Sequence, residues 1–474
     1  MNQKTVQPRV KGGVPVWAWG VLIVVGLVAV IGILREVKSV DPTAVFERGV
    51  AAFKTQDRDG VVKAAEALDG MDAPAEAKQI MEGLRWIALE RPLKALKPLE
   101  EAAKSPQYRL QAMTYLGIAH KDAAERFPAI EILTEVLKEE PDNGQALETL
   151  ATIYWELAAL DKANETLNRM IDLKHALTNA YRVSARIHYD RHHLAEAAEM
   201  YRAAIEVDPT SPLNGAAAAR LIECLYWTGK PEEISKYVGI ADMDPTVRAI
   251  QAEEELKEKG VDAALKVLQP VIDSQQFDAF AMVTFARLSA EQGPDKLAEA
   301  IGYMRFATPR FNREPLFYRG LAELADKAGE RELADACRQN ASQLDQLAEE
   351  FQVAVDELAA ADIDDIEIRM KTAEMAGQLN RLELARSFYA AARNIDHSIE
   401  AELGERLARA SVIKPELVST KDLAPSFPVV ALPSTQLEAE SLEMAVPQAD
   451  ETPATQGEPA SGPGSSDGSP EGDQ

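Results

Sequence analysis

Three histidines lie close together in the segment IHYDRHHLAEA, and their type and spacing suit metal chemistry better than any other residues in this chain. His188 and His192 are four positions apart, so on one helix they would share a face that could hold a metal ion. The residue after His188 is Tyr189, and the zinc-protease pattern HExxH is therefore missing. A zinc enzyme or metal carrier built on these histidines with His193 is one alternative, but we predict no metal and no other cofactor.

The other common catalytic motifs are also missing from the sequence. The glycines of GPGSSDGSPEG have no strand before them and no helix after them, so they do not form a phosphate-binding loop. No GxSxG motif occurs, and the many carboxylates stand at spacings typical of solvated helix faces. Cys224 and Cys337 are 113 positions apart, which fits neither a disulfide framework nor a zinc ribbon. We therefore predict that the protein is not an enzyme and has no catalytic residues.

Composition favours a helical protein that does not bind nucleic acid. The chain has 474 residues, with 51 Lys+Arg against 77 Asp+Glu and a net charge of −26. Phosphate binding needs clustered Lys and Arg, and no basic run occurs. Ala and Leu dominate and aromatic residues make up 6%, so the expected fold class is all-α.

An uncharged stretch of 21 residues, Val14 to Leu34, predicts one transmembrane helix. Trp17 and Trp19 stand near one end, where indole rings prefer the headgroup layer. A cleaved signal peptide is the alternative, but its apolar region would be shorter and would end in a small-residue cleavage site. We expect an uncleaved signal anchor over 14–34, preceded by a short basic N-terminus, 1–13. That basic end favours an N-in orientation with the main domain across the membrane.

From residue 41 to about residue 410 the sequence reads as successive short helices whose pattern repeats every 34 residues. The best units, 110–143, 144–177 and 178–211, follow each other without a gap. Positions 8 and 20 of a unit are small, whereas positions 7, 24 and 27 are mostly larger. Small residues let two helices of a hairpin approach closely, and larger ones fill the space between hairpins. Pro141 and Pro209, at position 32, end the second helix because proline lacks the N–H donor.

The repeated segment resembles the tetratricopeptide repeat family, in which helical hairpins stack into a solenoid because none can bury its apolar face alone. Weaker units with the same spacing occupy 76–109, 315–348 and 366–399, and a first, poorer unit starts near Pro42. The resemblance implies an α-solenoid of roughly eight to ten hairpins over 41–410. Residues 212–310 are either degenerate repeats or an insertion, and 339–368 suits an elongated helix or a joint between two blocks.

The resemblance also implies that partners bind on the concave face, which first-helix positions 2, 5, 9 and 12 line. In the best three units we select as candidate protein-binding residues Gln111, Thr114, Lys121, Trp155, Asn179, Arg182, Arg186 and Tyr189. Such side chains suit an extended peptide or a partner helix, although each could equally be an ordinary solvated residue. The family's clamp for C-terminal carboxylates needs Asn at position 9, which all three units lack, so we do not expect that ligand.

The C-terminal segment, 411–474, is rich in Pro, Ser, Gly and acids, with a net charge of −9 from Lys414 onward. It lacks the apolar content that would offset the entropy of ordering, so we predict a disordered tail. The apolar island FPVVALP, residues 427–433, could dock on the last repeats, bind a partner or be a linker.

These features together predict a membrane-anchored scaffold that mediates protein–protein interactions and complex assembly, without catalysis. A chaperone-like assembly factor for secreted or envelope proteins is the alternative. The arrangement resembles bacterial envelope proteins with one N-terminal anchor, so we expect a single-pass inner-membrane protein with its repeats outside the cytoplasm. The same solenoid facing the cytoplasm stays open, and the oligomeric state is not predicted.

Overall fold

The computed structural model describes residues 41–241, 243–399, 405–406, 417–421, 423 and 430. Within these residues there is no strand, and the helices are α2 (Pro42–Lys54), α3 (Arg58–Asp69), α4 (Ala75–Ala88), α5 (Leu93–Ala102), α6 (Arg109–Asp122), α7 (Arg126–Glu139), α8 (Gly144–Glu156), α9 (Leu160–Asp172), α10 (Leu177–Asp190), α11 (Leu194–Val207), α12 (Asn214–Trp227), η1 (Pro231–Lys236), α13 (Pro245–Lys259), α14 (Val261–Ser274), α15 (Ala279–Ala290), α16 (Pro294–Phe311), α17 (Pro315–Ala328), α18 (Arg331–Ala360), α19 (Ile366–Gln378), α20 (Leu382–Ile395) and η2 (His397–Ile399). The all-α class expected from the sequence is confirmed for this part of the chain.

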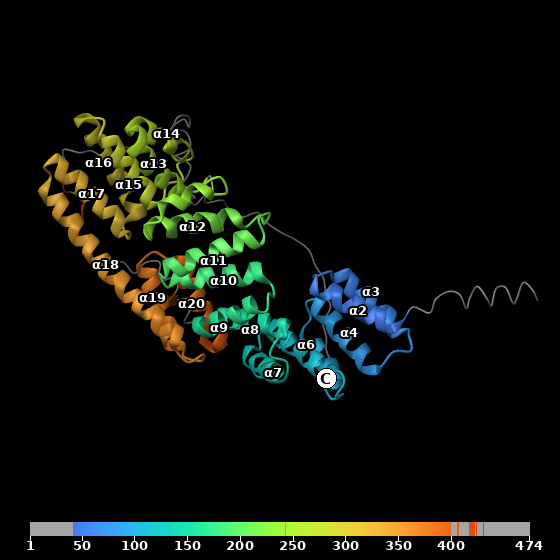
Figure 1. The fold of residues 1–474 in the computed structure, drawn as a ribbon. Coiled ribbons are helices and arrows are strands. Elements are labelled where there is room, and N and C mark those ends of the chain that lie inside the picture. The colour runs from blue at the N-terminus through green and yellow to red at the C-terminus, as the bar shows by residue number, and fades with distance from the viewer. Residues whose placement is uncertain are drawn as a thin grey trace, which may run out of the picture.

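The helices pair into ten consecutive hairpins, from α2–α3 to α19–α20, counted over the described ranges. They stack side by side along the chain (Figure 1). The expected solenoid is therefore confirmed, and the weak units at 76–109, 315–348 and 366–399 are helix pairs like the strong ones. The second helices α7 and α11 end just before Pro141 and Pro209, as predicted.

Each of the first five hairpins turns on one residue with a left-handed backbone. These residues are Gln56, Glu90, Ala124, Ala158 and His192, with φ between 52° and 64°, and each follows the last by 34 positions. A left-handed residue reverses the chain after the first helix with few connecting residues. The repeat period is therefore visible in the backbone itself, although none of these five residues is a glycine.

Small residues let the two helices of a hairpin approach, as the sequence predicts. A Cβ atom on Gly117 of α6 would lie 2.5 Å from the Leu133 side chain of α7, and one on Gly83 would lie as close to Leu99. Ala129, at position 20, is fully buried in the same interface. These contacts place the first helices at a fixed distance from the second ones, which leaves the first helices to line the opposite face.

The middle hairpins depart from the strict period. Gly229, Gly260 and Gly293 lie in turns of this region, each with positive φ. The sixth hairpin lacks a second α-helix, because residues after Gly229 form only the 3₁₀ turn η1. The described residues of 212–310 thus form helix pairs of irregular spacing, as degenerate repeats would.

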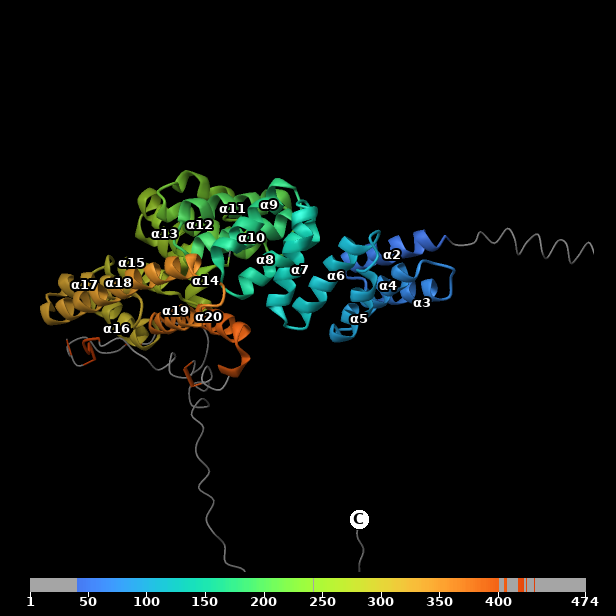
Figure 2. The same ribbon diagram turned by 90° about the horizontal axis from the view of Figure 1, so that it is seen from below.

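The chain from α8 to α20 returns on itself. Helix α18 is a single helix of 30 residues, which confirms the elongated helix expected around 339–368. Its second half, with α19 and α20, shares one hydrophobic core with α8, α9 and α10 (Figure 2). Phe351, Leu358 and Tyr389 lie in this core with Leu147 and Ile187. We call α8–α20 the closed block and α2–α7, which extends from it, the N-terminal arm.

The expected anchor at 14–34 lies outside the described residues. No helix of the described part combines the length and apolar character needed to cross a membrane. Residues 417–421, within the tail predicted to be disordered, lie against the closed block: Val418 hydrogen-bonds with Asn340 of α18. Val430, of the apolar island, donates its N–H to the Gly302 carbonyl at 3.2 Å.

Candidate functional site

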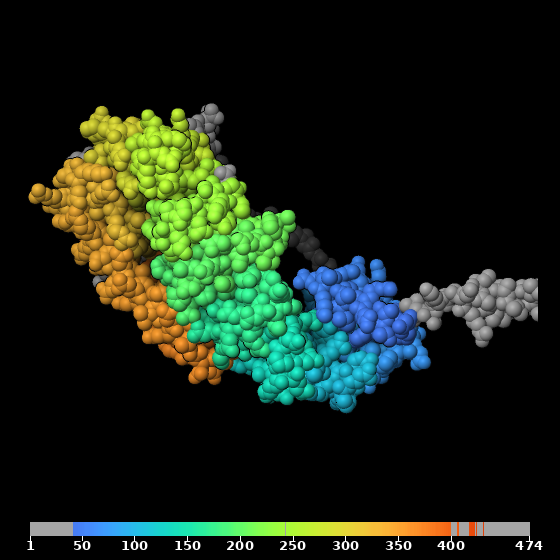
Figure 3. All heavy atoms as spheres, in the orientation of Figure 1, coloured from blue at the N-terminus to red at the C-terminus, as the bar shows by residue number. Residues whose placement is uncertain are grey.

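Two adjoining hollows lie on the face lined by the first helices of the N-terminal arm and α8. One has a volume of about 470 Å³ and the other about 350 Å³. Lys54, Gln145 and Glu148 line both, so the hollows form one continuous groove. In Figure 3 the surface is hollowed between the blue N-terminal hairpin and the teal and green hairpins. We call this surface the arm groove.

Helices α2, α4, α6 and α8 supply most of the walls of the arm groove. Its apolar part includes Val50 and Phe53 from α2, Ile87 from α4 and Ile118 from α6. Phe53 packs edge-on against Tyr115 of α6, with ring centroids 5.6 Å apart, and this contact holds α2 beside α6. Tyr115 is buried, and burial raises the pKa of its hydroxyl, which therefore stays neutral at physiological pH.

Several polar groups of the arm groove are held by internal hydrogen bonds. The Thr114 hydroxyl donates to the Leu110 carbonyl at 2.8 Å and accepts from Asn143 Nδ2 at 3.2 Å. Asn143 also begins α8, because its Oδ1 accepts the Ala146 N–H at 3.0 Å. These bonds fix the floor of the groove before any ligand arrives, which lowers the entropic cost of binding.

The charges of the arm groove are unevenly distributed. Its carboxylates have partners: Glu148 lies 3.3 Å from His175, and Asp122 pairs with Lys121 at 2.7 Å. Lys54 and Arg58, on the α2 side, are exposed and make no ion pair with any residue that the structure describes. The arm groove therefore offers an acidic ligand two cations at one edge and mixed polar groups along its length.

The predicted site residues divide between this groove and the closed block. Gln111, Thr114 and Lys121 line the arm groove, together with Gln145 and Glu148, which hold the equivalent positions of the next unit. The structure does not bring the other five predicted residues into this groove. Its lining also includes residues that our selection omitted, among them Val50 and Phe53. These are positions 9 and 12 of the poor unit that starts near Pro42, so applying the same rule there would have found them.

Three of the remaining predicted residues are engaged inside the chain. Arg182 donates to Ser211 Oγ at 2.6 Å, and Arg186 makes two bonds of 2.8 and 2.7 Å to Asp190. The Tyr189 hydroxyl accepts from Arg220 at 2.8 Å, and burial raises its pKa. A ligand would have to compete with these bonds, so this part of the first-helix face is the weaker candidate.

Trp155 and Asn179 have different surroundings again. Trp155 is half-buried and packs against the hydrophobic core that α8–α10 share with α18–α20. Asn179 is exposed. Trp155 is therefore a packing residue in this structure, because α20 covers the end of α8.

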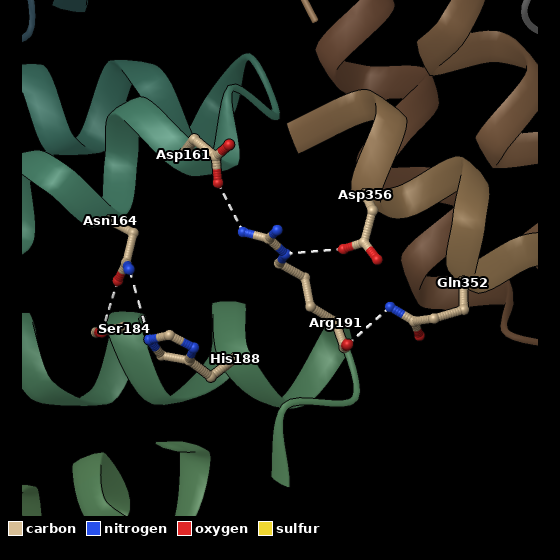
Figure 4. Close-up of polar contacts among 7 residues, drawn as sticks. All are labelled: Asp161, Asn164, Ser184, His188, Arg191, Gln352 and Asp356. Atoms are coloured by element: carbon tan, nitrogen blue, oxygen red, sulfur yellow. Dashed lines mark hydrogen bonds and ion pairs between the residues drawn. The ribbon is translucent and has the colours of Figure 1, made fainter. Parts of the chain in front are cut away.

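The histidines that suggested metal chemistry lie at the turn of the fifth hairpin. His188 Nε2 lies 3.4 Å from Asn164 Nδ2, and Asn164 Oδ1 accepts from Ser184 at 2.7 Å (Figure 4). Burial, with a smaller effect of His193, lowers the pKa of His188. Within the described ranges no three His, Cys, Asp or Glu side chains converge as a metal site.

Arg191, in the same turn, joins the two ends of the closed block. It donates to Asp161 of α9 at 2.6 Å and to Asp356 of α18 at 3.1 Å, while its carbonyl accepts from Gln352 at 2.7 Å (Figure 4). Two further contacts reach the end of α8. Arg369 donates to the Leu157 carbonyl at 2.7 Å, and Asn394 donates to the Glu156 carbonyl at 3.1 Å. We call these contacts the closure.

The fold and the groove define a solenoid of helical hairpins with a prepared surface on its first helices, which is the architecture of an interaction scaffold. Residues 128–187 match the tetratricopeptide repeat family model. The matched repeats lie where the 34-residue spacing is clearest.

Known proteins resemble this chain only distantly. No curated protein matches its sequence. A tetratricopeptide repeat protein from Parabacteroides merdae has 15% identity and a TM-score of 0.31, with 56% of this chain and 99% of that chain covered. The apo form of RapI has 14% identity and a TM-score of 0.44, with 65% and 98% covered.

Proposed function

We propose that the protein is a membrane-anchored scaffold that binds an extended, acidic segment of a partner protein in the arm groove and so assembles a complex at the membrane. The continuous groove on the first helices carries this proposal. Its apolar side chains provide contact area, its amides provide hydrogen bonds, and Lys54 and Arg58 complement acidic side chains. The chemistry of the lining supports binding, and no catalytic step is proposed.

The proposed anchor is the apolar segment 14–34, which places the arm groove close to the bilayer. Residue 42 begins α2, so only a few residues separate the anchor from the first hairpin. The proposed location is the bacterial inner membrane, with the repeats outside the cytoplasm. Membrane fractionation of the full chain and of a chain lacking 14–34 tests the anchor, and a reporter fused after Gln474 tests the orientation.

Site-specific photo-crosslinking tests the arm groove. A photoreactive residue at Ile118, in the groove, is compared with one at Lys162, which is exposed on the second helix α9. A single stoichiometric partner crosslinked from position 118 alone would support the scaffold. Many unfolded clients would favour the chaperone-like assembly factor instead.

A matched pair of charge reversals tests which surface the captured partner uses. Lys54→Glu removes a groove cation, whereas Lys162→Glu makes the same change of net charge on α9. We expect Lys54→Glu to weaken binding by about 10-fold, or about 1.4 kcal/mol, because an acidic side chain would then face a carboxylate. Equal affinities for the two variants would rule out the arm groove as the binding surface.

A further inference from the structure

Residues 417–421 are held on the closed block mainly through their backbone. The buried side-chain amide of Asn340, on α18, makes two hydrogen bonds to Val418. Its Nδ2 donates to the Val418 carbonyl at 2.9 Å, and its Oδ1 accepts the Val418 N–H at 2.7 Å. Arg305 of α16 donates to the Lys421 carbonyl at 2.7 Å. Figure 2 shows the short red segments beside α16 and α17.

These hydrogen bonds recognise the backbone of an extended chain and do not depend on the identity of a side chain. An amide that both donates to and accepts from one residue imitates the pairing of neighbouring β-strands. Ser419 and Lys421 are exposed, whereas Thr420 between them is buried. Leu417 packs against the hydrophobic core of α15–α18. The side chains of Leu417 and Thr420, three positions apart, therefore supply the sequence preference.

The site is separate from the arm groove. Asn340 and Arg305 belong to second helices, α18 and α16, whereas first helices line the arm groove. A cavity of about 790 Å³ runs between the segment and the α16–α17 region, lined by Phe306, Asn312 and Tyr318 among others. The surface is thus wider than the segment that lies on it.

Asn340 is fully buried, so its amide needs hydrogen-bond partners. If residues 417–421 left with nothing in their place, the two bonds to Val418 would be lost. An incoming peptide backbone would restore both bonds. The chemistry of the site therefore favours exchange of one extended segment for another over an empty site.

We propose that α16, α17 and α18 form a second binding site, which takes an extended peptide of the Leu-Val-Ser-Thr-Lys type from a partner protein. Residues 417–421 are its resident ligand and block it in the free protein. A partner segment with an apolar side chain at the position of Leu417 and a small one at the position of Thr420 binds by displacing them. The resident segment thereby sets a threshold of affinity that the partner must exceed.

A proline substitution empties the site without altering its walls. V418P in the full chain removes the N–H that Asn340 accepts, while V418A keeps both backbone bonds. The probe is a fluorescent peptide with the sequence of residues 414–424, followed by anisotropy. A tethered segment competes at an effective concentration of about 1 mM, so a peptide with a dissociation constant of about 10 µM should bind V418P roughly 100-fold more tightly than the wild type. V418A should stay near the wild type.

Two further measurements show whether the added peptide uses Asn340. Combining Asn340→Asp with V418P removes the donor to the peptide carbonyl, so the gain in affinity should disappear. A probe peptide that itself carries proline at the position of Val418 should fail to bind the V418P chain, and this comparison of two peptides is made on one and the same protein. Equal binding of the first peptide to wild type and V418P, or unchanged binding of the proline peptide, would overturn the proposal.

Discussion

At the scale of single residues, the turns of the first five hairpins show how the repeat is built and where it is strained. A left-handed backbone costs an L-residue other than glycine about 1–2 kcal/mol, yet Ala124 and Ala158 adopt it. Packing of the two helices on either side compensates for this cost. The turn is therefore a position where the sequence is not optimal for its own backbone.

Replacing Ala124 by glycine should stabilise the protein. Ala124 is exposed with φ of 64°, so the substitution removes strain without opening a cavity. We expect Ala124→Gly to raise the free energy of unfolding by about 0.5–1 kcal/mol, measured by urea denaturation. The neighbouring Ala123 has φ of −79°, so Ala123→Gly is the control and should destabilise. A loss of stability in both variants would contradict the role assigned to the turn.

His188 should make stability depend on pH. Because burial lowers its pKa in the folded state, the unfolded chain takes up the proton more readily, and stability falls as pH drops below about 6.5. His188→Phe should reduce the decrease in Tm between pH 7.5 and pH 5.5. His397, exposed in η2, provides the control substitution His397→Phe, which should leave the decrease as it is in the wild type. If Tm decreases by the same amount in both variants as in the wild type, His188 does not cause the pH dependence of stability.

At the scale of elements, local pattern predicted the hairpins well, but it did not predict the closure. Small residues, prolines and turns act within about 34 residues, so the sequence displays them directly. Arg369 and Leu157, which form one of the contacts of the closure, are 212 positions apart. From sequence alone, an arginine within a helix is expected to be a solvated cation. The signal for the closure is spread over residues that have no special spacing.

The same reasoning explains why three of the eight predicted site residues lie in the arm groove and five do not. Gln111 and Lys121 belong to the arm, where no helix after α8 in the described part of the chain lines the groove on the first helices. Trp155 follows the same positional rule, but the C-terminal hairpin covers the end of α8. Arg182 and Arg186 reach internal partners instead. A position within a repeat therefore predicts the face of a helix, but it does not predict what packs on that face.

The buried Arg369 should hold the C-terminal hairpin in place. It is fully buried and donates to the carbonyls of Leu157, Asp362 and Asp365. Arg369→Met keeps much of the volume but leaves these carbonyls without a donor, which should destabilise α19 and α20 by about 2 kcal/mol. Faster amide hydrogen exchange in both helices would report this change.

Lys371 on the same helix is the matched control for that experiment. It is exposed and its ion pair with Glu357, at 3.2 Å, is a surface contact. Lys371→Met should change stability by less than about 0.5 kcal/mol. Unaltered exchange of α19 and α20 in Arg369→Met would show that apolar packing alone maintains the closure.

At the scale of the whole molecule, the arm and the closed block differ in how they are supported. Among the helices that the structure describes, the main contacts of each arm hairpin are with its neighbours in sequence, as in an open repeat array. Hairpins α8–α9 and α10–α11 have these neighbours and, in addition, contacts with α18–α20. Closure therefore adds long-range contacts that the arm lacks.

Unfolding should accordingly start in the arm. We expect native-state hydrogen exchange to show α2–α5 opening at a lower free energy than α8–α10, with α8–α10 and α18–α20 exchanging as one cooperative unit. In Arg369→Met that unit should divide, so that α19 and α20 exchange before α8. Slowest exchange in α2–α5 would contradict this view of the molecule.

The length of α18 has a final consequence. Thirty residues at about 1.5 Å each make a rod of about 45 Å, one end of which belongs to the ninth hairpin while the other meets α9. The length of α18 must therefore match the distance that the preceding hairpins cover between its two ends. Insertions in hairpins four to eight must therefore be matched in α18, whereas hairpins added to the arm meet no such restriction.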